Sequence, residues 1–403
     1  MTSEWKTSPL RDLVGFISKG IAPSYADEES ETTVRVLNQK CNRNFRITYS
    51  ESRLHDLARK KVPAERFVRI DDILINSTGA GTAGRIAQIC NLPCDTIVDG
   101  HMIIIRANDK VSQKYLGYAM KAHQWEVLQL DEGSTGQTEL NRERLLDEIM
   151  ISYPTSFALQ ETIVKTLEGI DRKLLINEKV NDNLQQQAAA LFESWFVNYD
   201  PWDGVQPSEW ENAPLGSFVE IKRGGSPRPI QDFLSDSGLR WLKISDVTSL
   251  SSPFVLEIKE HIKEEGLRKT VFLHAGELVL SNSATPGIPK ILDVDTCIHD
   301  GWLYFPKSEL SKYYLYLFFK HIRKELVALG NGSVFTNLKT DILKAFPATK
   351  ADESALKEFD ALVTPLFDAM LNADRENFKL AAMRDALLPK LMSSEIDVSE
   401  VEL

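Results

Sequence analysis

The two halves of this sequence repeat each other at a separation of about 205 residues, and this repeat constrains the fold more than any other feature. The residues matched at the start of each repeat are Trp5, Pro9, Leu10 and Val14 in the first half and Trp210, Pro214, Leu215 and Val219 in the second. The dipeptide Asp99–Gly100 is echoed by Asp300–Gly301. Each repeat ends in a long helical stretch, so the expected order is globule, helix, globule, helix. A duplicated globule suits a two-fold target, and duplex DNA is the commonest polymer of that kind.

The globules have the pattern of mixed α and β structure. Short β-type runs, separated by Gly, Asn, Asp and Ser turns, are expected at Leu10–Phe16, Val34–Leu37, Ile73–Ile75, Arg85–Ile89 and Met102–Ile105. Helical spacing follows in each repeat, at Tyr115–Leu130 and at Tyr313–Leu329. We predict the α+β class, with two similar α/β domains joined by two long antiparallel coiled-coil helices in a pseudo-two-fold internal repeat. The predicted boundaries are 1–154 for the first domain, 155–200 for the central helix, 206–347 for the second domain, 348–394 for the distal helix and 395–403 for an acidic tail.

Both helical stretches carry seam positions that step alternately by four and three residues, as in a coiled coil. The residues expected to pair the helices are Leu167, Ile170, Leu174, Asn181, Leu184 and Leu191 in the first stretch and Val363, Leu366, Met370, Asn377, Leu380 and Leu387 in the second. Polar seam residues cost stability and fix register. The alternative is that each helix packs only on its own globule, but their matched length and polar positions favour mutual pairing. Pro365 is expected to interrupt the second helix.

The net charge of −11 does not exclude a DNA-binding protein, because the acidity is unevenly distributed. Residues 1–154 carry 20 basic and 21 acidic groups, and residues 206–347 carry 17 of each. The helices and the tail are acidic, with 4 basic against 8 acidic groups in 155–205 and 6 against 12 in 348–403. A nearly neutral globule can still present one basic face. The balance argues only against strong DNA binding by the chain alone.

Several other kinds of site are disfavoured. Cys90 and Cys94 form a lone C-x3-C pair without the second ligand pair of a zinc site, so we predict no bound metal. The pattern Gly79-x-Gly81-x-x-Gly84 fits a dinucleotide fingerprint, but the stretch after it is too short for a helix and breaks at Pro93. A hairpin loop is the better interpretation. With no signal region and no apolar run that could span a bilayer, the chain is expected to be cytoplasmic.

The helical motifs resemble a known family. Leu184–Pro201 is similar to the central conserved segment of the DNA-specificity subunits of type I restriction–modification enzymes, and Leu380–Leu391 to their distal segment. The stretches Asp72–Gly84 and Ile97–Ile105 resemble their target-recognition domains. The resemblance implies that each recognition domain reads one half of a split, asymmetric site. It also implies that the helices act as a spacer and as the docking surface for two methyltransferase subunits, with motor–nuclease restriction subunits added for cleavage.

The sequence lacks catalytic motifs, which agrees with this resemblance. We find no G-x-x-x-x-G-K-[ST] loop of a nucleotide-driven motor and no Asn-Pro-Pro-Tyr/Phe motif of an amino-methyltransferase. Catalysis is therefore expected in partner subunits, which would bind S-adenosylmethionine, ATP and Mg, while this chain binds no cofactor. Two alternatives remain: a bipartite type IIB system with a fused methyltransferase–nuclease, and a duplicated scaffold that does not bind DNA.

Candidate DNA contacts are polar loop residues of both globules. Arg and Lys can bind guanine edges or phosphates, and Asn and Gln can pair with adenine edges. The candidates of the first globule are Lys19, Asn38, Gln39, Lys40, Ser77, Thr78, Arg85, His101, Gln137 and Asn141. Those of the second are Lys222, Arg223, Arg228, Lys243, Ser245, Asn282, Thr285, Lys290, His299, Asn337 and Lys339. For any one of them, a solvated surface or turn residue is an equally good interpretation.

Overall fold

The chain forms two compact units that each contain parts distant in sequence. The computed structural model describes residues 4–79, 81–132, 139–330 and 337–398. Unit 1 consists of Met1–Arg172 with Ala381–Leu403, and unit 2 consists of Lys173–Leu380. Both long helices are therefore divided between the units.

Unit 1 contains two four-stranded sheets and shorter strand pairs among its described residues. The first sheet has the order β10 (Thr96–Val98), β4 (Thr33–Leu37), β7 (Arg53–Asp56), β3 (Tyr25–Ala26), and the second has β2 (Val14–Lys19), β11 (Met102–Ala107), β8 (Ile73–Asn76), β9 (Ile86–Gln88). The strand pairs are β1 (Trp5–Pro9) with β14 (Met150–Pro154), β5 (Asn42–Arg43) with β6 (Arg46–Ile47), and β12 (Asp131–Glu132) with β13 (Glu139–Leu140). The shorter helices are α1 (Gln113–Ala122), α2 (Gln124–Val127) and α3 (Arg142–Glu148).

Unit 2 repeats this plan with two five-stranded sheets. One has the order β16 (Val219–Arg223), β25 (Trp302–Ser308), β22 (Leu278–Ser281), β23 (Pro289–Leu292), β19 (Phe254–Val255), and the other has β17 (Leu234–Ser235), β20 (His261–Ile262), β18 (Leu239–Leu242), β24 (Thr296–Ile298), β21 (Val271–Leu273). A further pair joins β15 (Glu211–Pro214) to β26 (Pro347–Lys350). The shorter helices are α5 (Ser245–Thr248), α6 (Lys312–His321), α7 (Arg323–Gly330) and α8 (Thr340–Ala345).

Strand register confirms that the two units share one fold. In unit 1, β2 pairs antiparallel with β11 and β4 pairs parallel with β10; in unit 2, β16 pairs antiparallel with β25 and β18 parallel with β24. The helices after these strands also correspond. Ser112 caps α1 by accepting a hydrogen bond from the third backbone N–H after it, and Ser311 caps α6 in the same way. Equivalent residues can therefore be compared between the units.

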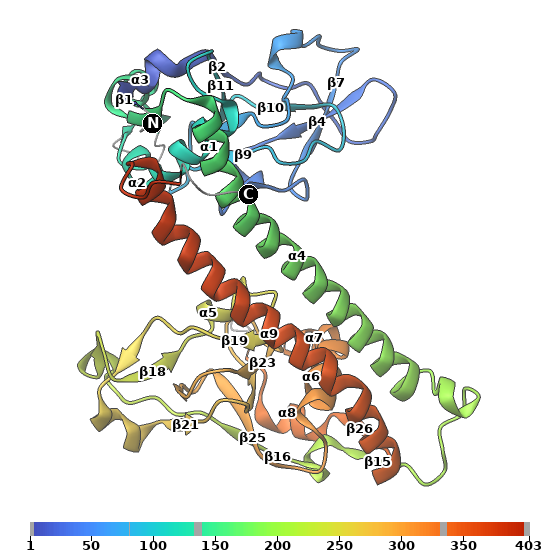
Figure 1. The fold of residues 1–403 in the computed structure, drawn as a ribbon. Coiled ribbons are helices and arrows are strands. Elements are labelled where there is room, and N and C mark those ends of the chain that lie inside the picture. Colours follow the sequence, from blue (N-terminus) through green and yellow to red (C-terminus); the bar gives the residue numbers. More distant parts are fainter. Residues whose placement is uncertain (1–3, 80, 133–138, 331–336, 399–403) are drawn as a thin grey trace. The chain divides into compact units, whose positions relative to one another are not determined.

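The long helices α4 (Phe157–Phe196) and α9 (Glu353–Met392) complete the core of each unit. In unit 1, Leu159 and Ile163 of α4 share a buried apolar cluster with Leu388 and Leu391 of α9. The red end of α9 accordingly lies among the unit 1 elements in Figure 1. In unit 2, the beginning of α9 and the end of α4 enter one aromatic-rich cluster. No helix in the described parts of the chain is both long and apolar enough to cross a membrane.

Polar side chains join α4 and α9 within each unit. In unit 2, Asn177 Nδ2 donates to Asn377 Oδ1 over 2.9 Å, and Asn181 Nδ2 donates to Asp374 Oδ1 over 2.7 Å. The partner number falls on α9 as it rises on α4, so the segments are antiparallel. All twelve residues named above for helix pairing are buried or half-buried: Leu167, Ile170, Leu174, Asn181, Leu184, Leu191, Val363, Leu366, Met370, Asn377, Leu380 and Leu387.

Two local expectations were wrong. Leu10–Leu13 forms a 3-10 turn rather than the start of a strand, and both of its leucines are buried; the strand begins at Val14. The α9 helix also continues through Pro365, although proline removes one backbone donor. Pro365 is exposed, while Val363 and Phe367 on either side of it are buried in the unit 2 core. This packing holds the helix together across the missing hydrogen bond.

Candidate nucleic-acid interface

The same tight turn connects the two sheets in each unit. In unit 1 it runs from Asp99 to Met102, where the Met102 N–H donates to the Asp99 carbonyl over 3.1 Å. In unit 2 the Trp302 N–H donates to the His299 carbonyl over 3.1 Å. The structural counterpart of Asp99 is therefore His299. The sequence match of Asp99–Gly100 with Asp300–Gly301 was displaced by one residue.

Asp99 and His299 have the same structural role despite their different chemistry. Asp99 Oδ1 accepts the backbone N–H of His101 over 2.9 Å, and His299 Nδ1 accepts the N–H of Gly301 over 2.8 Å. Burial lowers the pKa of His299, which favours the neutral imidazole that can act as an acceptor. His299 is thus held inside the turn, in agreement with the alternative interpretation of this histidine as a turn residue.

A glycine and a basic residue stand beside the turn in both units. A Cβ on Gly20 would overlap the carbonyl oxygen of Asp99, and one on Gly224 would overlap that of His299. Only glycine permits this approach of the backbone. The residue before each glycine is basic and ends the neighbouring strand: Lys19 pairs in register with Ile103, and Arg223 with Leu303. The fold therefore places one cation beside each turn.

These cations are held by neighbouring groups. Lys19 forms an ion pair with Glu139, and the Arg223 Nε donates to the carbonyl oxygen of Asp300. Arg228 also pairs with Asp300, with 3.1 Å between Nη2 and the carboxylate. Since Lys19, Arg223 and Arg228 are exposed, each remains accessible to a phosphate or a base edge from solvent.

The polar loop after the central strand of each unit closes over the same turn. In unit 1, the Ser77 N–H donates to the His101 carbonyl over 2.8 Å, and Thr78 Oγ1 lies 2.6 Å from His101 Nδ1. In unit 2, the Asn282 N–H donates to the Gly301 carbonyl over 2.9 Å. The side chains of Ser77 and Asn282 are buried, so they support the loop, whereas the side chain of His101 is exposed.

A third segment completes each site. The Leu140 N–H donates to the Ser77 carbonyl over 2.8 Å, and the Leu338 N–H donates to the Asn282 carbonyl over 2.7 Å. These bonds bring in the neighbouring candidates Asn141, which caps α3, and Asn337 and Lys339, which are exposed. The structure thus gathers, in each unit, the following candidates around one turn: Lys19, Ser77, Thr78, His101 and Asn141 in unit 1, and Arg223, Arg228, Asn282, His299, Asn337 and Lys339 in unit 2.

Other candidates lie apart from the turn or serve the fold. Asn38 caps the 3-10 turn Gln39–Cys41, where Gln39 is half-buried and Lys40 exposed. Arg85 donates to the Gly81 carbonyl over 3.2 Å. The remaining candidates of unit 2 outside the turn are Lys222, paired with Glu220; Lys243, paired with Glu260; the exposed Ser245; and the half-buried Thr285. Gln137 lies outside the described residues.

Lys290 requires a correction. The sequence predicts an exposed polar loop residue at Lys290, but Lys290 lies in β23 and only 3 % of it is exposed. Its Nζ donates to the backbone carbonyls of Leu250 and Ser252. A side chain enclosed in this way is not a surface contact for a base edge.

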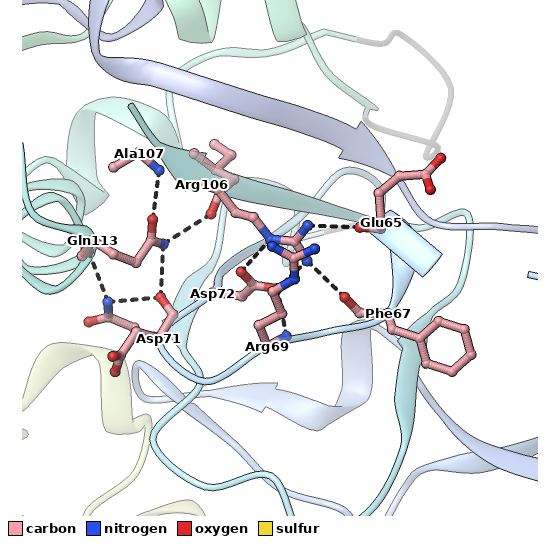
Figure 2. Close-up of polar contacts among 10 residues, drawn as sticks. Glu65, Phe67, Arg69, Asp71, Asp72, Arg106, Ala107 and Gln113 are labelled. Atoms are coloured by element: carbon pink, nitrogen blue, oxygen red, sulfur yellow. Dashed lines mark hydrogen bonds and ion pairs between the residues drawn. The ribbon is translucent and has the colours of Figure 1, made fainter. Parts of the chain in front are cut away.

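Sequence reasoning missed a buried polar network that fixes the end of β11 in unit 1. Figure 2 shows Arg106 between the Asp72 carboxylate and the carbonyl oxygens of Glu65 and Phe67. The Arg106 Nε lies 2.7 Å from Asp72 Oδ1, and both side chains are nearly buried. The repeat gave a partial signal, because Glu277 matches Asp72 and each carboxylate accepts the N–H three residues before it. The arginine has no counterpart in unit 2, where Pro306 follows Phe305. No group of three or more His, Cys, Asp or Glu side chains suited to a metal occurs among the described residues.

The chain matches the model of one protein family, described as the type I restriction modification DNA specificity domain, over residues 2–186 and 207–348. It is 25% identical over 313 residues to the type I restriction enzyme MjaIX specificity subunit of Methanocaldococcus jannaschii, which covers 73% of this chain and 71% of that relative. It is 23% identical over 310 residues to the HindI specificity subunit of Haemophilus influenzae, covering 59% and 67%.

The fold is similar to a solved structure. The crystal structure of the S subunit of a type I restriction–modification system from M. genitalium aligns with a TM-score of 0.61 at 15% identity, covering 99% of this chain and 98% of the other. At this identity the similarity concerns the fold, and it extends over both units and both long helices.

Proposed function

The chain belongs to the type I restriction–modification DNA specificity family, and from this premise we propose that each of its two units reads one half of a bipartite, asymmetric DNA site. It is the specificity subunit of such a system. The observation that carries the proposal is the duplicated turn, with an exposed cation held beside it in each unit. Since the loops around the turns differ in sequence, the half-sites they read are expected to differ as well.

The proposed contacts divide into two kinds. Lys19 in unit 1 and Arg223 and Arg228 in unit 2 are suited to phosphates or guanine edges, because they are cationic and exposed. His101, Asn337 and Lys339 are exposed polar groups next to the same turns. The buried Ser77 and Asn282 and the half-buried His299 position these loops, so their replacement should impair recognition indirectly.

Catalysis and cofactors are proposed to belong to partner subunits. The family is one of DNA-recognition proteins, and this sequence lacks the motor and methyltransferase motifs. We propose two methyltransferase subunits and motor–nuclease restriction subunits as partners, with S-adenosylmethionine, ATP and Mg bound there. The exposed apolar side chains Leu175, Ile176 and Val180 of α4 and Phe378 and Met383 of α9 are suited to such subunits.

The test is to map methylated adenines in cells that carry this chain with the methyltransferase of its own system. A bipartite motif should appear. The variant Arg223→Ala with Arg228→Ala should lose selectivity in one half of the motif, and Lys19→Ala should affect the other half. Loss of selectivity in both halves from either variant, or methylation without a bipartite motif, would contradict the proposal.

A further inference from the structure

A small pocket in unit 2 gathers three cations and no acidic residue. It has a volume of about 130 Å³ and lies between β23, α5 and the junction of α6 with α7. Its polar lining consists of the cations Lys290, Lys320 and Arg323 and the hydroxyl-bearing residues Thr248, Ser251 and Tyr316. Like charges repel more strongly in a partly dehydrated site than in water. Unless a group of opposite charge offsets this repulsion, the pocket lowers the stability of the fold.

Lys290 is the innermost of the three cations. Its Nζ lies 2.6 Å from the Leu250 carbonyl and also donates to the Ser252 carbonyl, so its ammonium is anchored at the wall of the pocket. Burial lowers the pKa of Lys290 to about 7, with Lys320 and Arg323 acting in the same direction and Asp374 of α9 against them. The two carbonyls supply partial negative charge, but no carboxylate reaches the ammonium.

Arg323 brings a donor that no group in the described structure accepts. Its Nε is buried and has no hydrogen-bond partner. Unpaired buried donors are rare in folded proteins because their desolvation is not compensated. Lys320 is exposed and has no ion pair among the described residues, and partial desolvation and Arg323 lower its pKa. The arrangement offers donors from the three cationic side chains and the hydroxyl of Ser251, whereas the Thr248 hydroxyl donates to the Ser245 carbonyl.

The repeat supplies an internal comparison. The serine caps of α1 and α6 make Gln124 the counterpart of Arg323 and Lys121 the counterpart of Lys320. In unit 1, Gln124 is satisfied, since Nε2 donates to the Gly84 carbonyl over 2.7 Å and Oε1 accepts the Ile86 N–H over 2.8 Å. Lys121 lies 3.4 Å from Asp171.

In unit 2 these neutralising groups are replaced. The sequence counterpart of Asp171 is Phe367, and strand register makes Ala87 the counterpart of Lys290. Arg323 Cγ comes within 3.3 Å of the position of a Cβ on Gly287, so it occupies the place of Gln124 beside the loop without forming its hydrogen bonds. Unit 1 thus has a hydrogen-bonded amide at this position, whereas unit 2 has several positive charges there.

We propose that this pocket of unit 2 binds a tetrahedral oxyanion of the phosphate class, held by Lys290, Lys320 and Arg323. An oxyanion would accept from the unpaired Arg323 Nε and neutralise the three cations, and charge-assisted hydrogen bonds of this kind are the strong ones. The phosphate has two possible sources: free phosphate or the backbone of bound DNA. The anion site itself does not depend on the proposed function, since free phosphate can fill it without DNA.

The first arm of the test is calorimetric titration of the full chain with inorganic phosphate. The wild type should bind, and Arg323→Gln, which installs the residue of unit 1, should weaken binding by about tenfold or more. Lys320→Gln should act in the same direction and serves as a second variant if the first misfolds. Lys324→Gln is the matched control, because it removes the same charge from an exposed neighbouring position outside the pocket. Circular dichroism checks the fold of each variant.

The second arm measures binding of a duplex of arbitrary sequence as a function of salt. Each phosphate contact contributes about 0.9 to the slope of log affinity against log salt. If the pocket holds a backbone phosphate, Arg323→Gln should reduce the slope by about that amount, while Lys324→Gln should not. An unchanged slope together with lost phosphate binding would identify free phosphate as the ligand.

The proposal is overturned if the folded wild type binds no phosphate and the slope is unaffected by Arg323→Gln. It is also overturned if Lys324→Gln weakens phosphate binding as much as Arg323→Gln, because the attraction would then be diffuse. A wild type that binds phosphate in the pocket but binds no DNA even when assembled with its methyltransferase subunits would instead contradict the proposed function and leave the anion site standing.

Discussion

At the scale of single residues, equivalent positions of the two units make the same kind of hydrogen bond with different side chains. Asp99 and His299 both accept the N–H two residues ahead. An aspartate does so at any pH above its own titration, whereas an imidazole loses its acceptor nitrogen when it is protonated. Burial also raises the pKa of Asp99, but a protonated carboxyl group keeps acceptor oxygens, so protonation removes the acceptor altogether only in the turn of unit 2.

The pH dependence of unit 2 follows from His299. Its pKa is lowered in the folded state, so the unfolded chain binds the proton first as the pH falls. The contribution of His299 to stability is complete above its unfolded pKa of about 6.5 and is lost as the pH falls through the lower folded value. We expect His299→Asp to reduce the loss of stability between pH 7 and pH 5 in urea unfolding. His274→Gln, at an exposed histidine, is the control, and an unchanged pH profile for His299→Asp would contradict the argument.

Arg106 offers a second residue-scale prediction. Removing one partner of a buried ion pair leaves the other charge uncompensated, which costs about 3–5 kcal/mol. Arg106→Ala should therefore lower the unfolding free energy of unit 1 by an amount of this order, because Asp72 and two carbonyls lose their donor. Arg11→Ala removes an exposed arginine paired with Asp147 and should have a much smaller effect in the same denaturant titration. Equal losses would show that burial of the pair does not matter.

At the scale of elements, we expect α4 and α9 to set the distance between the two half-sites, because the two ends of each helix belong to different units. Each helix has 40 residues, or about 60 Å at roughly 1.5 Å per residue. The unit boundaries fall between Arg172 and Lys173 and between Leu380 and Ala381. An insertion at both places leaves the contacts within each unit intact, including those of Asn181 with Asp374 and of Arg384 with Asp171.

We predict that four residues inserted at both boundaries lengthen the unspecified gap of the target. The insertion adds roughly 6 Å, nearly two base pairs at about 3.4 Å each, and turns the helix by about 400°, which nearly restores its apolar face. Both half-sites should remain as they were. Methylome mapping is the measurement, and an active variant with an unchanged gap would show that something else sets the distance. The same insertion next to Val205, in the segment after α4, is the control.

Regular elements were predictable because their signal is periodic. The four–three spacing predicted both long helices, and the strands around Val34, Ile73 and Met102 lie where the apolar runs predict. The strand prediction for Leu10–Leu13 was wrong because two buried leucines three residues apart suit a tight turn as well as a strand. The gathering of Lys19, Ser77 and Asn141 around one turn was not predictable, because strand order and register are not written in local patterns. The burial of Lys290 also required the structure, since a lone lysine in a short run normally indicates an exposed position.

At the scale of the whole molecule, the two units are expected to act as separate reading modules. Each has its own core and its own copy of the turn. We predict that replacing residues 1–154 with the equivalent domain of a relative changes one half-site and preserves the other. Sequencing the methylated sites of the chimera is the test. Alteration of both half-sites would mean that the units read DNA jointly.

The isolated chain is predicted to bind DNA weakly and to transfer no methyl group. Its net charge of −11 opposes association with a polyanion, and the exposed cations at the turns are few. Anisotropy measurements should give specific binding weaker than nanomolar at physiological salt, with tight binding restored by the methyltransferase subunits. Nanomolar specific binding by the chain alone, or methylation without partners, would contradict this prediction.

The division of both helices between the units has a consequence for how the protein is made. Unit 2 is one continuous stretch, so it has all its residues once translation passes Leu380. Unit 1 begins to emerge first, yet its apolar cluster includes Leu388, Leu391 and Met392, which are synthesised about two hundred residues after the rest of it. During translation, the first half of the chain therefore exposes part of its apolar cluster until the last residues are synthesised. The half that is translated second is free to fold first.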